Sequence, residues 1–304
     1  MIFALPFPSI DPELFSITVF GFELALRWYA LAYIAGIVLG WWLVVRMVKR
    51  PALWGSEPPL TPALAEALLT WMVLGVVLGG RLGFVLFYQF DHYRAHPGEI
   101  LQVWQGGMSF HGGFLGVVLA LILFSLKNGL PMVRVGDAVA AVAPIGILFG
   151  RLANFINGEL WGRPTMMPWG VVFPDPGAQI CAERFGEICA RHPSQIYEAV
   201  LEGAVLGLVL LWGITRRRWL AVPGRTIGIF LIGYGLGRTL AEGFRQADAQ
   251  FITEVNPFGH IVRLGETPEA WGLTMGQVLS LPMILAGLVV LTLARRAVAT
   301  AAKS

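Results

Sequence analysis

Four arginines interrupt stretches of this sequence that are otherwise composed of apolar residues: Arg27, Arg81, Arg151 and Arg238. A charged side chain at the centre of a bilayer costs at least ~2.5–3.5 kcal/mol on insertion scales, so such a residue predicts a functional site. Guanidinium is well suited to bind phosphate or carboxylate through two parallel hydrogen bonds. The four arginines therefore predict a site for an anionic group within a membrane. Arg81 has a second interpretation, since its surroundings, GGRLGF, also suit close helix packing.

One apolar stretch carries a stripe of polar side chains. Tyr234, Arg238, Glu242 and Arg245 recur every three or four residues, which places them along one face of a helix. Arg238 and Glu242 could merely neutralise each other as a pair four residues apart. Such a pair does not explain Tyr234 and Arg245, so the stripe favours a binding face.

His111 follows the residues WQGGMSF at the start of another apolar stretch. Its pKa in the neutral range suits proton transfer, although a single histidine can equally have a structural role. The adjoining glycines also have two interpretations. They allow the backbone to approach a lipid head group, or they permit tight packing of helices. These glycines are Gly106, Gly107, Gly112 and Gly113.

The composition places these residues in an integral membrane protein. The chain has 304 residues, of which 56% are hydrophobic and 13% are charged, and its mean hydropathy is +0.67. Soluble domains carry about a quarter charged residues, whereas about 20 apolar residues cross a bilayer as a helix. We therefore expect an all-α fold, a single transmembrane catalytic domain over residues 1–304 with about seven spans. The spans are expected at residues 20–45, 65–88, 110–126, 135–156, 196–214, 226–244 and 275–293.

The basic residues of the loops predict the orientation of the spans. They are concentrated after the first, third, fifth and seventh spans, as in the run Arg216, Arg217 and Arg218. The positive-inside rule then places the N-terminus outside and the C-terminus in the cytoplasm. In this orientation the four arginines of the apolar stretches fall in the outer half of the membrane. Residues 157–195, after the fourth span, form a small extracytoplasmic cap.

Cys181 and Cys189 are the two cysteines of the chain, and both lie in the expected cap. An oxidising compartment would permit a disulfide between them. A reduced pair is equally compatible with the sequence, because spacing does not fix the geometry that a disulfide requires.

Several classes of protein are disfavoured because their motifs are missing. The sequence has no HExxH, no Gly-x-Ser-x-Gly, no Gly-rich phosphate loop and no Cys/His cluster with metal-ligand spacing. We expect neither a metal nor a cofactor. The net charge of +3 comes from basic residues placed by membrane topology, so nucleic acid is not an expected partner. Two candidates remain: an enzyme acting on an anionic phospholipid, and a transporter or binding protein for such a lipid in the outer leaflet.

Five segments resemble blocks of the bacterial prolipoprotein diacylglyceryl transferases, in the order of that family. They are HGGFLG, GRLANFINGELWG, RHPSQIYE, GYGLGRTLAEGFR and LTMGQVLSLPMILAG. The resemblance implies a multi-pass protein of the bacterial cytoplasmic (inner) membrane with its active site on the extracytoplasmic side. It implies transfer of the diacylglyceryl group of phosphatidylglycerol to the lipobox cysteine thiol of a prolipoprotein, forming a thioether and releasing glycerol phosphate. Its partners would be membrane lipid, these two substrates and downstream lipoprotein-processing enzymes.

Roles for individual residues follow from this resemblance and from the chemistry. A thiol has a pKa near ~8.5 and needs a base or positive surroundings to become a thiolate. His111, or Glu242 through His111, is the candidate proton acceptor. Arg151 and Arg238 are assigned to the phosphate, where negative charge develops. Tyr29 is a further catalytic candidate that lines the same pocket. The other candidates for binding or orienting the lipid are Arg81, Asn154, Glu159, Gly162, Tyr234 and Arg245. Glu159 has a second possible role, which is to orient an arginine.

Overall fold

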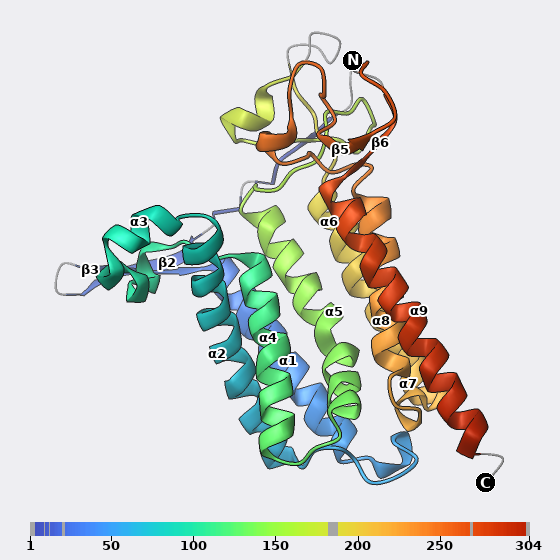
Figure 1. The fold of residues 1–304 in the computed structure, drawn as a ribbon. Helices are drawn as coiled ribbons and strands as arrows, with labels where there is room; N and C mark the ends of the chain where they lie inside the picture. Colours follow the sequence, from blue (N-terminus) through green and yellow to red (C-terminus); the bar gives the residue numbers. More distant parts are fainter. Residues whose placement is uncertain are drawn as a thin grey trace. The chain divides into compact units, whose positions relative to one another are not determined.

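The computed structural model describes residues 4–8, 10–11, 13–19, 22–181, 188–267 and 270–301. Most of the described chain is helical (Figure 1). Besides short 3-10 helices, its helices are α1 (Trp28–Val48), α2 (Pro62–Phe87), α3 (Phe90–Ala95), α4 (Phe110–Lys127), α5 (Met132–Ile156), α6 (Ser194–Glu198), the π-helix η6 (Ala199–Val205), α7 (Leu206–Arg217), α8 (Arg225–Ala241) and α9 (Met275–Ala301). Short strands of the described chain pair as β1 (Leu5–Pro6) with β4 (Val171–Val172), β2 (Glu13–Val19) with β3 (Phe22–Arg27), and β5 (His260–Arg263) with β6 (Gly272–Thr274).

Each of the seven predicted spans overlaps a helical segment. A shorter apolar helix covers His111–Lys127, and α8 has 17 residues. These helices support a mostly helical, multi-pass membrane protein, while the number of spans and their direction remain predictions. Within the described residues, five helices are long and apolar enough to cross a membrane: Trp28–Val48, Pro62–Phe87, Met132–Ile156, Ser194–Arg217 and Met275–Arg296.

The first predicted span begins too early in the sequence. Helix α1 starts at Trp28, and the residues before it form the antiparallel hairpin of β2 and β3. Strand β2, ELFSITV, contains one residue each of Phe, Ile, Thr and Val, and β-branched and aromatic side chains favour strands. Arg27 pairs with Glu13 across the hairpin at 2.9 Å, and 63% of its side chain is exposed. The prediction that Arg27 lies within an apolar helix is therefore wrong.

Contacts divide the chain into two compact units. The first comprises Met1–Gly40, Ala140–Arg217 and Arg225–Ser304, and the second comprises Trp41–Val139 and Arg218–Gly224. The long helices α1 and α5 each contribute residues to both units. A single catalytic domain remains a prediction from the sequence.

In the second unit, α2 and α4 pack against each other through glycines (Figure 1). Gly79 and Gly83 lie four residues apart and so share one face of α2. A Cβ added to Gly79 would lie 2.8 Å from Gly116 Cα, and one added to Gly83 would lie 2.7 Å from Gly112 Cα. Membrane helices approach this closely where small residues face each other. Tight helix packing, one of the two interpretations of the glycines beside His111, is therefore confirmed for Gly112.

In the first unit, the fifth predicted span is not a uniform α-helix. It begins as α6, continues as the π-helix η6, and ends as α7. π-Helical turns are rare and occur often at functional sites. A Cβ on Gly203 of η6 would lie 2.8 Å from Leu148 Cα in α5, and a Cβ on Gly237 of α8 would lie 3.3 Å from Glu202 Cγ. The π-helical segment therefore contacts both α5 and α8.

The predicted cap folds around a buried arginine. Arg191 is 3% exposed, and its guanidinium donates to the carbonyls of Ala178 at 2.5 Å and Ile180 at 2.7 Å. The ring of Trp161 lies 4.0 Å from the guanidinium carbon. Burial lowers the pKa of Arg191 to about 10. Hydrogen bonds to a charged donor contribute about 1.5–3 kcal/mol each, so Arg191 fixes the cap backbone.

Cys181 and Cys189 form a disulfide in the cap. The structure thus resolves the choice between a disulfide and a reduced pair, which the sequence leaves open. The side of the membrane on which the cap lies remains a prediction.

Candidate active site

Glu198 is the centre of a charged cluster in the first unit. Only 2% of its side chain is exposed, and its Oε2 lies 2.6 Å from Nε of Arg151. Its Oε1 accepts a hydrogen bond from Nη1 of Arg238 at 2.7 Å and lies 3.7 Å from Nε of Arg245. One carboxylate at the start of the fifth predicted span therefore joins arginines from α5, from α8 and from the segment after α8.

Glu242 is the second buried carboxylate of the cluster. It accepts hydrogen bonds at Oε1 from Nη2 of Arg238 at 2.5 Å and from Nη1 of Arg245 at 3.3 Å. Its Oε2 accepts from Oγ1 of Thr274 at 2.7 Å. A Cβ on Gly276 would collide with this carboxylate, so the start of α9 leaves space only for glycine beside it.

These ion pairs form one arginine–glutamate network, in which three guanidinium groups meet two carboxylates. The side chains of the arginines are 20%, 12% and 17% exposed in chain order, whereas the carboxylates are 2% and 3% exposed. These five side chains therefore carry one excess positive charge, and the arginines are partly open to a ligand. A single phosphodiester would balance that charge. Arg245 also pairs with Asp248 at 3.7 Å, but 58% of that side chain is exposed, so water screens its charge. The members of the network are Arg151, Glu198, Arg238, Glu242 and Arg245.

The interpretation of Arg238 and Glu242 as an isolated neutralising pair is wrong. Arg238 uses two different nitrogens, one for Glu198 and one for Glu242. It therefore bridges two carboxylates that lie on separate segments of the chain.

The end of α5 continues the network. Arg151 donates from Nη1 to Oδ1 of Asn154 at 3.4 Å, and Asn154 donates from Nδ2 to Oε1 of Glu159 at 2.8 Å. The hydroxyl of Tyr29 interacts with Asn154 and lies 3.0 Å from the hydroxyl of Tyr33. The structure thus brings Tyr29, Asn154 and Glu159 together with Arg151, and their contact with a substrate remains a prediction.

Tyr234 and Gly162 also lie in this region of the first unit. Tyr234 is one turn before Arg238 on α8 and interacts electrostatically with Arg238 and Arg151. Gly162 forms a bridge with Arg245, and a Cβ at Gly162 would lie 2.5 Å from the carbonyl oxygen of Phe244. Gly162 therefore allows the cap backbone to approach the end of α8, whereas its contact with a lipid remains a prediction.

Arg81 and His111 belong to the second unit, so a shared site with the arginine–glutamate network remains a prediction for both. Arg81 is 4% exposed, and its guanidinium donates to the carbonyls of Glu99 at 2.7 Å, Ile100 at 2.8 Å and Gly106 at 2.7 Å. These bonds favour the packing role that the sequence left open for Arg81. His111 lies exposed in the first turn of α4.

The sequence interpretation missed two residues of the site, Glu198 and Thr274. The signal for Glu198 was present, since it is an acid at the entrance of an apolar span and the last residue of RHPSQIYE. Thr274 carries no comparable signal, because its role depends on the pairing of β6 beside the start of α9.

Aromatic side chains hold the cap against the end of α8. Nδ1 of His192 lies 3.1 Å from the hydroxyl of Tyr197, and the rings of His192 and Phe244 pack edge to face at 5.1 Å. Burial, and then the charge of Arg163, lower the pKa of His192 below its usual value of 6.5. A histidine in this setting is kept neutral by the folded protein.

Acidification should therefore destabilise the cap. Since the pKa of His192 is lower in the folded state, the unfolded state binds more protons, and stability falls as the pH drops through about 6.5 towards the folded-state pKa. We expect the thermal midpoint to fall between about pH 8 and about pH 5, and the fall to be smaller in His192→Gln. His260, whose pKa is also lowered by burial, contributes a separate part of the fall, so the double variant His192→Gln/His260→Gln should show a smaller fall than His192→Gln alone. An unchanged pH profile in His192→Gln would contradict the assignment.

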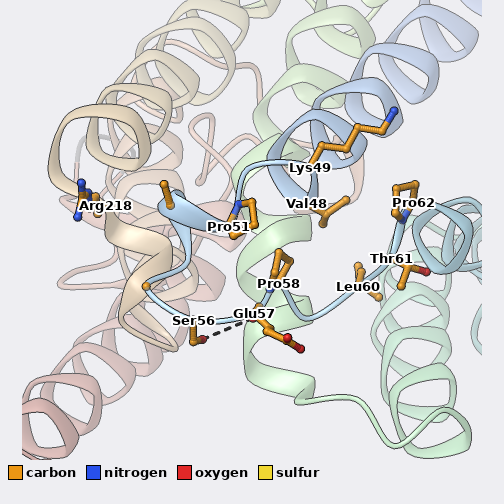
Figure 2. Close-up of a pocket in the computed structure, with 12 residues that line it drawn as sticks. Val48, Lys49, Pro51, Ser56, Glu57, Pro58, Leu60, Thr61, Pro62 and Arg218 are labelled. Carbon is orange, nitrogen blue, oxygen red and sulfur yellow. Dashed lines mark hydrogen bonds between the residues drawn. The ribbon is translucent and has the colours of Figure 1, made fainter.

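A separate hollow of about 850 Å³ lies in the second unit, between the segment after α1 and Arg218 (Figure 2). Figure 2 shows Lys49 and Arg218 on different sides of it, with their charged ends pointing away from each other. Glu57 also lines the hollow. Its charged groups do not converge on a common point, so we assign no binding role to it.

Comparison with known proteins covers nearly the whole chain. The sequence matches the family model for prolipoprotein diacylglyceryl transferase over residues 14–293. A phosphatidylglycerol–prolipoprotein diacylglyceryl transferase of Cereibacter sphaeroides is 59% identical over 292 residues, which are 96% of this chain and 98% of that protein. Proteins of the same name are 59% identical over 285 residues in Ruegeria pomeroyi, covering 93% and 95% of the two chains, and 48% identical over 298 residues in Rhizobium meliloti, covering 98% and 96%.

Proposed function

The chain belongs to the prolipoprotein diacylglyceryl transferase family, and we propose that its arginine–glutamate network binds the phosphate of phosphatidylglycerol during transfer of the diacylglyceryl group. The acceptor is a cysteine thiol in the lipobox of a prolipoprotein. The sulfur forms a thioether with the glycerol carbon, the bond from that carbon to the phosphate oxygen breaks, and glycerol phosphate leaves. Downstream lipoprotein-processing enzymes then receive the product.

The observation that carries this proposal is the excess positive charge of the network. Phosphatidylglycerol has one negative charge on its phosphodiester and a neutral head group, so it matches three arginines held by two carboxylates. A zwitterionic lipid would bring a second cation to the same place. Charge matching therefore favours an anionic phospholipid.

Arg151 and Arg238 bind the phosphate oxygens in this proposal. Negative charge grows on the phosphate as the carbon–oxygen bond breaks, and one preorganised donor of this kind can contribute about 2.7–4 kcal/mol to transition-state stabilisation. The buried carboxylates keep the guanidinium groups in place before the lipid arrives, so little reorganisation is needed during the reaction.

The polar residues beside the arginines orient the lipid. Asn154 and Tyr234 hold the head group, Glu159 accepts from the glycerol hydroxyls, and Tyr29 lines the same region. Glu242 acts as a charge partner rather than as the proton acceptor, because two arginines and Thr274 already occupy its oxygens. His111 remains the candidate acceptor of the thiol proton.

We place the reaction on the extracytoplasmic side of the bacterial cytoplasmic membrane. Two observations support this side. The basic loops favour an external cap, and the cap contains the disulfide of Cys181 and Cys189, a bond that persists in oxidising compartments.

Direct transfer tests this function. The purified protein is incubated with phosphatidylglycerol labelled in its acyl chains and a peptide that contains a lipobox cysteine. We expect the peptide to gain the mass of one diacylglyceryl group, and a peptide with serine at that position to gain none. Movement of the labelled lipid between leaflets without any gain in peptide mass would instead support a transporter.

A further inference from the structure

Glu202 is a buried carboxyl group that the proposed function does not use. It lies in the π-helix η6, one turn after Glu198. Its exposed fraction is 0%, and neither Oε1 nor Oε2 has a hydrogen-bond partner among the described residues. Glu198 is equally buried, yet it meets three arginines. The two glutamates therefore differ in their surroundings, and we expect them to differ in protonation state.

A carboxylate in the position of Glu202 would be an unpaired anion away from water. Burying an isolated ionised carboxylate costs so much free energy that such a group takes up a proton instead. A neutral carboxylic acid in an apolar environment can act as a donor at neutral pH. We therefore treat Glu202 as an acid that retains its proton in the resting protein.

Glu202 lies against the segment that presents the phosphate-binding arginine. A Cβ on Gly237, the residue before Arg238, would be 3.3 Å from Glu202 Cγ. The charges of Arg238, Arg151 and Arg245 act on Glu202, together with that of Glu198. Glu198 and Glu242 accept hydrogen bonds from arginine and so hold no proton to donate. Among the described carboxyl groups of this cluster, Glu202 is thus the one with a proton available.

We propose that Glu202 is the acid that protonates the departing phosphate oxygen. This inference rests on the proposed function. The thiol sulfur, having lost its proton to a base, attacks the glycerol carbon, and the electron pair of the carbon–oxygen bond moves to the phosphate oxygen. Glu202 gives its proton to that oxygen, so glycerol phosphate leaves as a monoanion and Glu202 becomes a carboxylate. The proton taken from the thiol then returns to Glu202, which restores the acid and balances the reaction.

Protonation relieves a specific electrostatic problem. The network has one excess positive charge, which a phosphodiester neutralises. Breaking the carbon–oxygen bond adds a second negative charge to the phosphate in a site of low dielectric, where that charge is costly. A proton from Glu202 removes it without a further arginine. General acid catalysis of this kind contributes about 10²–10⁴-fold to a rate.

The test compares Glu202→Gln with the parent protein on two lipids. One is phosphatidylglycerol, and the other is a diacylglyceryl 4-nitrophenyl phosphate, whose phosphate is a weaker base and needs less protonation on leaving. We expect Glu202→Gln to lower kcat with phosphatidylglycerol by about 10²-fold or more, with KM within about twofold of the parent, because only proton donation is lost. With the nitrophenyl lipid the loss should be at most about tenfold. A merely structural role would lower both rates equally.

Tyr234→Phe is the matched control, since the hydroxyl of Tyr234 is another proton-bearing group that interacts with Glu202. Its loss should reduce transfer from both lipids by the same factor. A dependence on the leaving group in Tyr234→Phe, but not in Glu202→Gln, would overturn the proposal in favour of the tyrosine.

Infrared spectroscopy gives a readout that does not depend on activity. In detergent without ester groups, the difference spectrum between the parent and Glu202→Gln should contain the C=O stretching band of a protonated carboxylic acid. Absence of this band would overturn the proposal, as would a kcat within about threefold of the parent in folded Glu202→Gln. Failure of the parent to transfer from either lipid would contradict the proposed function itself.

Discussion

Replacing Glu198 with glutamine should lower kcat/KM for diacylglyceryl transfer by about 10²–10³-fold, because removing one partner of a buried ion pair costs about 3–5 kcal/mol. Glutamine has nearly the same shape but no charge. Both carboxylate oxygens of Glu198 contact guanidinium groups. In the variant, the amide nitrogen would replace one of these oxygens, so one donor would face another donor. Arg151 and Arg238 would lose the anion that holds them in one arrangement. The initial rate of peptide mass gain at several lipid concentrations measures the effect.

Glu13→Gln is the matched control for Glu198→Gln. Glu13 also pairs with an arginine, Arg27, at 2.9 Å, but the two side chains are 34% and 63% exposed. Exposed pairs contribute about 0–1 kcal/mol, so this variant should retain transfer within about twofold of the parent. If Glu198→Gln behaved like Glu13→Gln in a folded protein, Glu198 could not be the residue that positions the arginines.

The arginines of the site could be predicted from the sequence, whereas the partner that positions them could not. Arg151 and Arg238 stand out because a charge in an apolar stretch is costly and needs a reason. Glu198 lies at the first turn of a span, where an acid is compatible with a simple helix end. Its central role arises because α5, α6 and α8 place their polar groups together in the first unit, and such packing leaves no periodic signal.

Arg81 illustrates the opposite case. Its sequence context resembles that of Arg151, since both follow glycine in an apolar stretch. In the structure the guanidinium of Arg81 donates to main-chain carbonyls of the segment from Glu99 to Gly107, whereas Arg151 meets a carboxylate. The acceptors of Arg81 belong to the backbone, which every sequence contains. No pattern of residue types could therefore separate the two roles.

The presence of the helices could be predicted from the length of the apolar stretches, whereas the start of α1 and the π-helical segment could not. About 20 apolar residues in a row predict a span by length alone, and each predicted span overlaps a helical segment. The hairpin before α1 was hidden because most residues of β3, FELALR, are apolar and lead directly into the apolar helix. The π-helix η6 was hidden because its register depends on close contacts such as that of Gly203 with Leu148 in α5.

Replacing Arg238 with alanine should abolish detectable transfer, and replacing it with lysine should restore little of it. Arg238 donates from Nη1 to Glu198 at 2.7 Å and from Nη2 to Glu242 at 2.5 Å. Lysine has a single nitrogen on a flexible stem and cannot hold two carboxylates and a phosphate in this planar arrangement. We expect Arg238→Ala to lose about 10³-fold or more in kcat/KM, since the variant loses a phosphate donor and removes one arginine partner from each of two buried carboxylates.

Two experiments separate the loss of the planar guanidinium group from the loss of its charge. One replaces Arg245 with lysine, and the other adds guanidinium ions to Arg238→Ala. The bonds of Arg245 to the same carboxylates are longer, at 3.3 Å to Glu242 and 3.7 Å to Glu198. Arg245→Lys should therefore lower kcat/KM by a factor about tenfold smaller than Arg238→Lys does. Guanidinium ions should recover part of the activity of Arg238→Ala, whereas ammonium ions at the same concentration should not. If Arg238→Lys matched the parent, a positive charge alone would suffice, and the forked bridge between Glu198 and Glu242 would have no part in binding the phosphate.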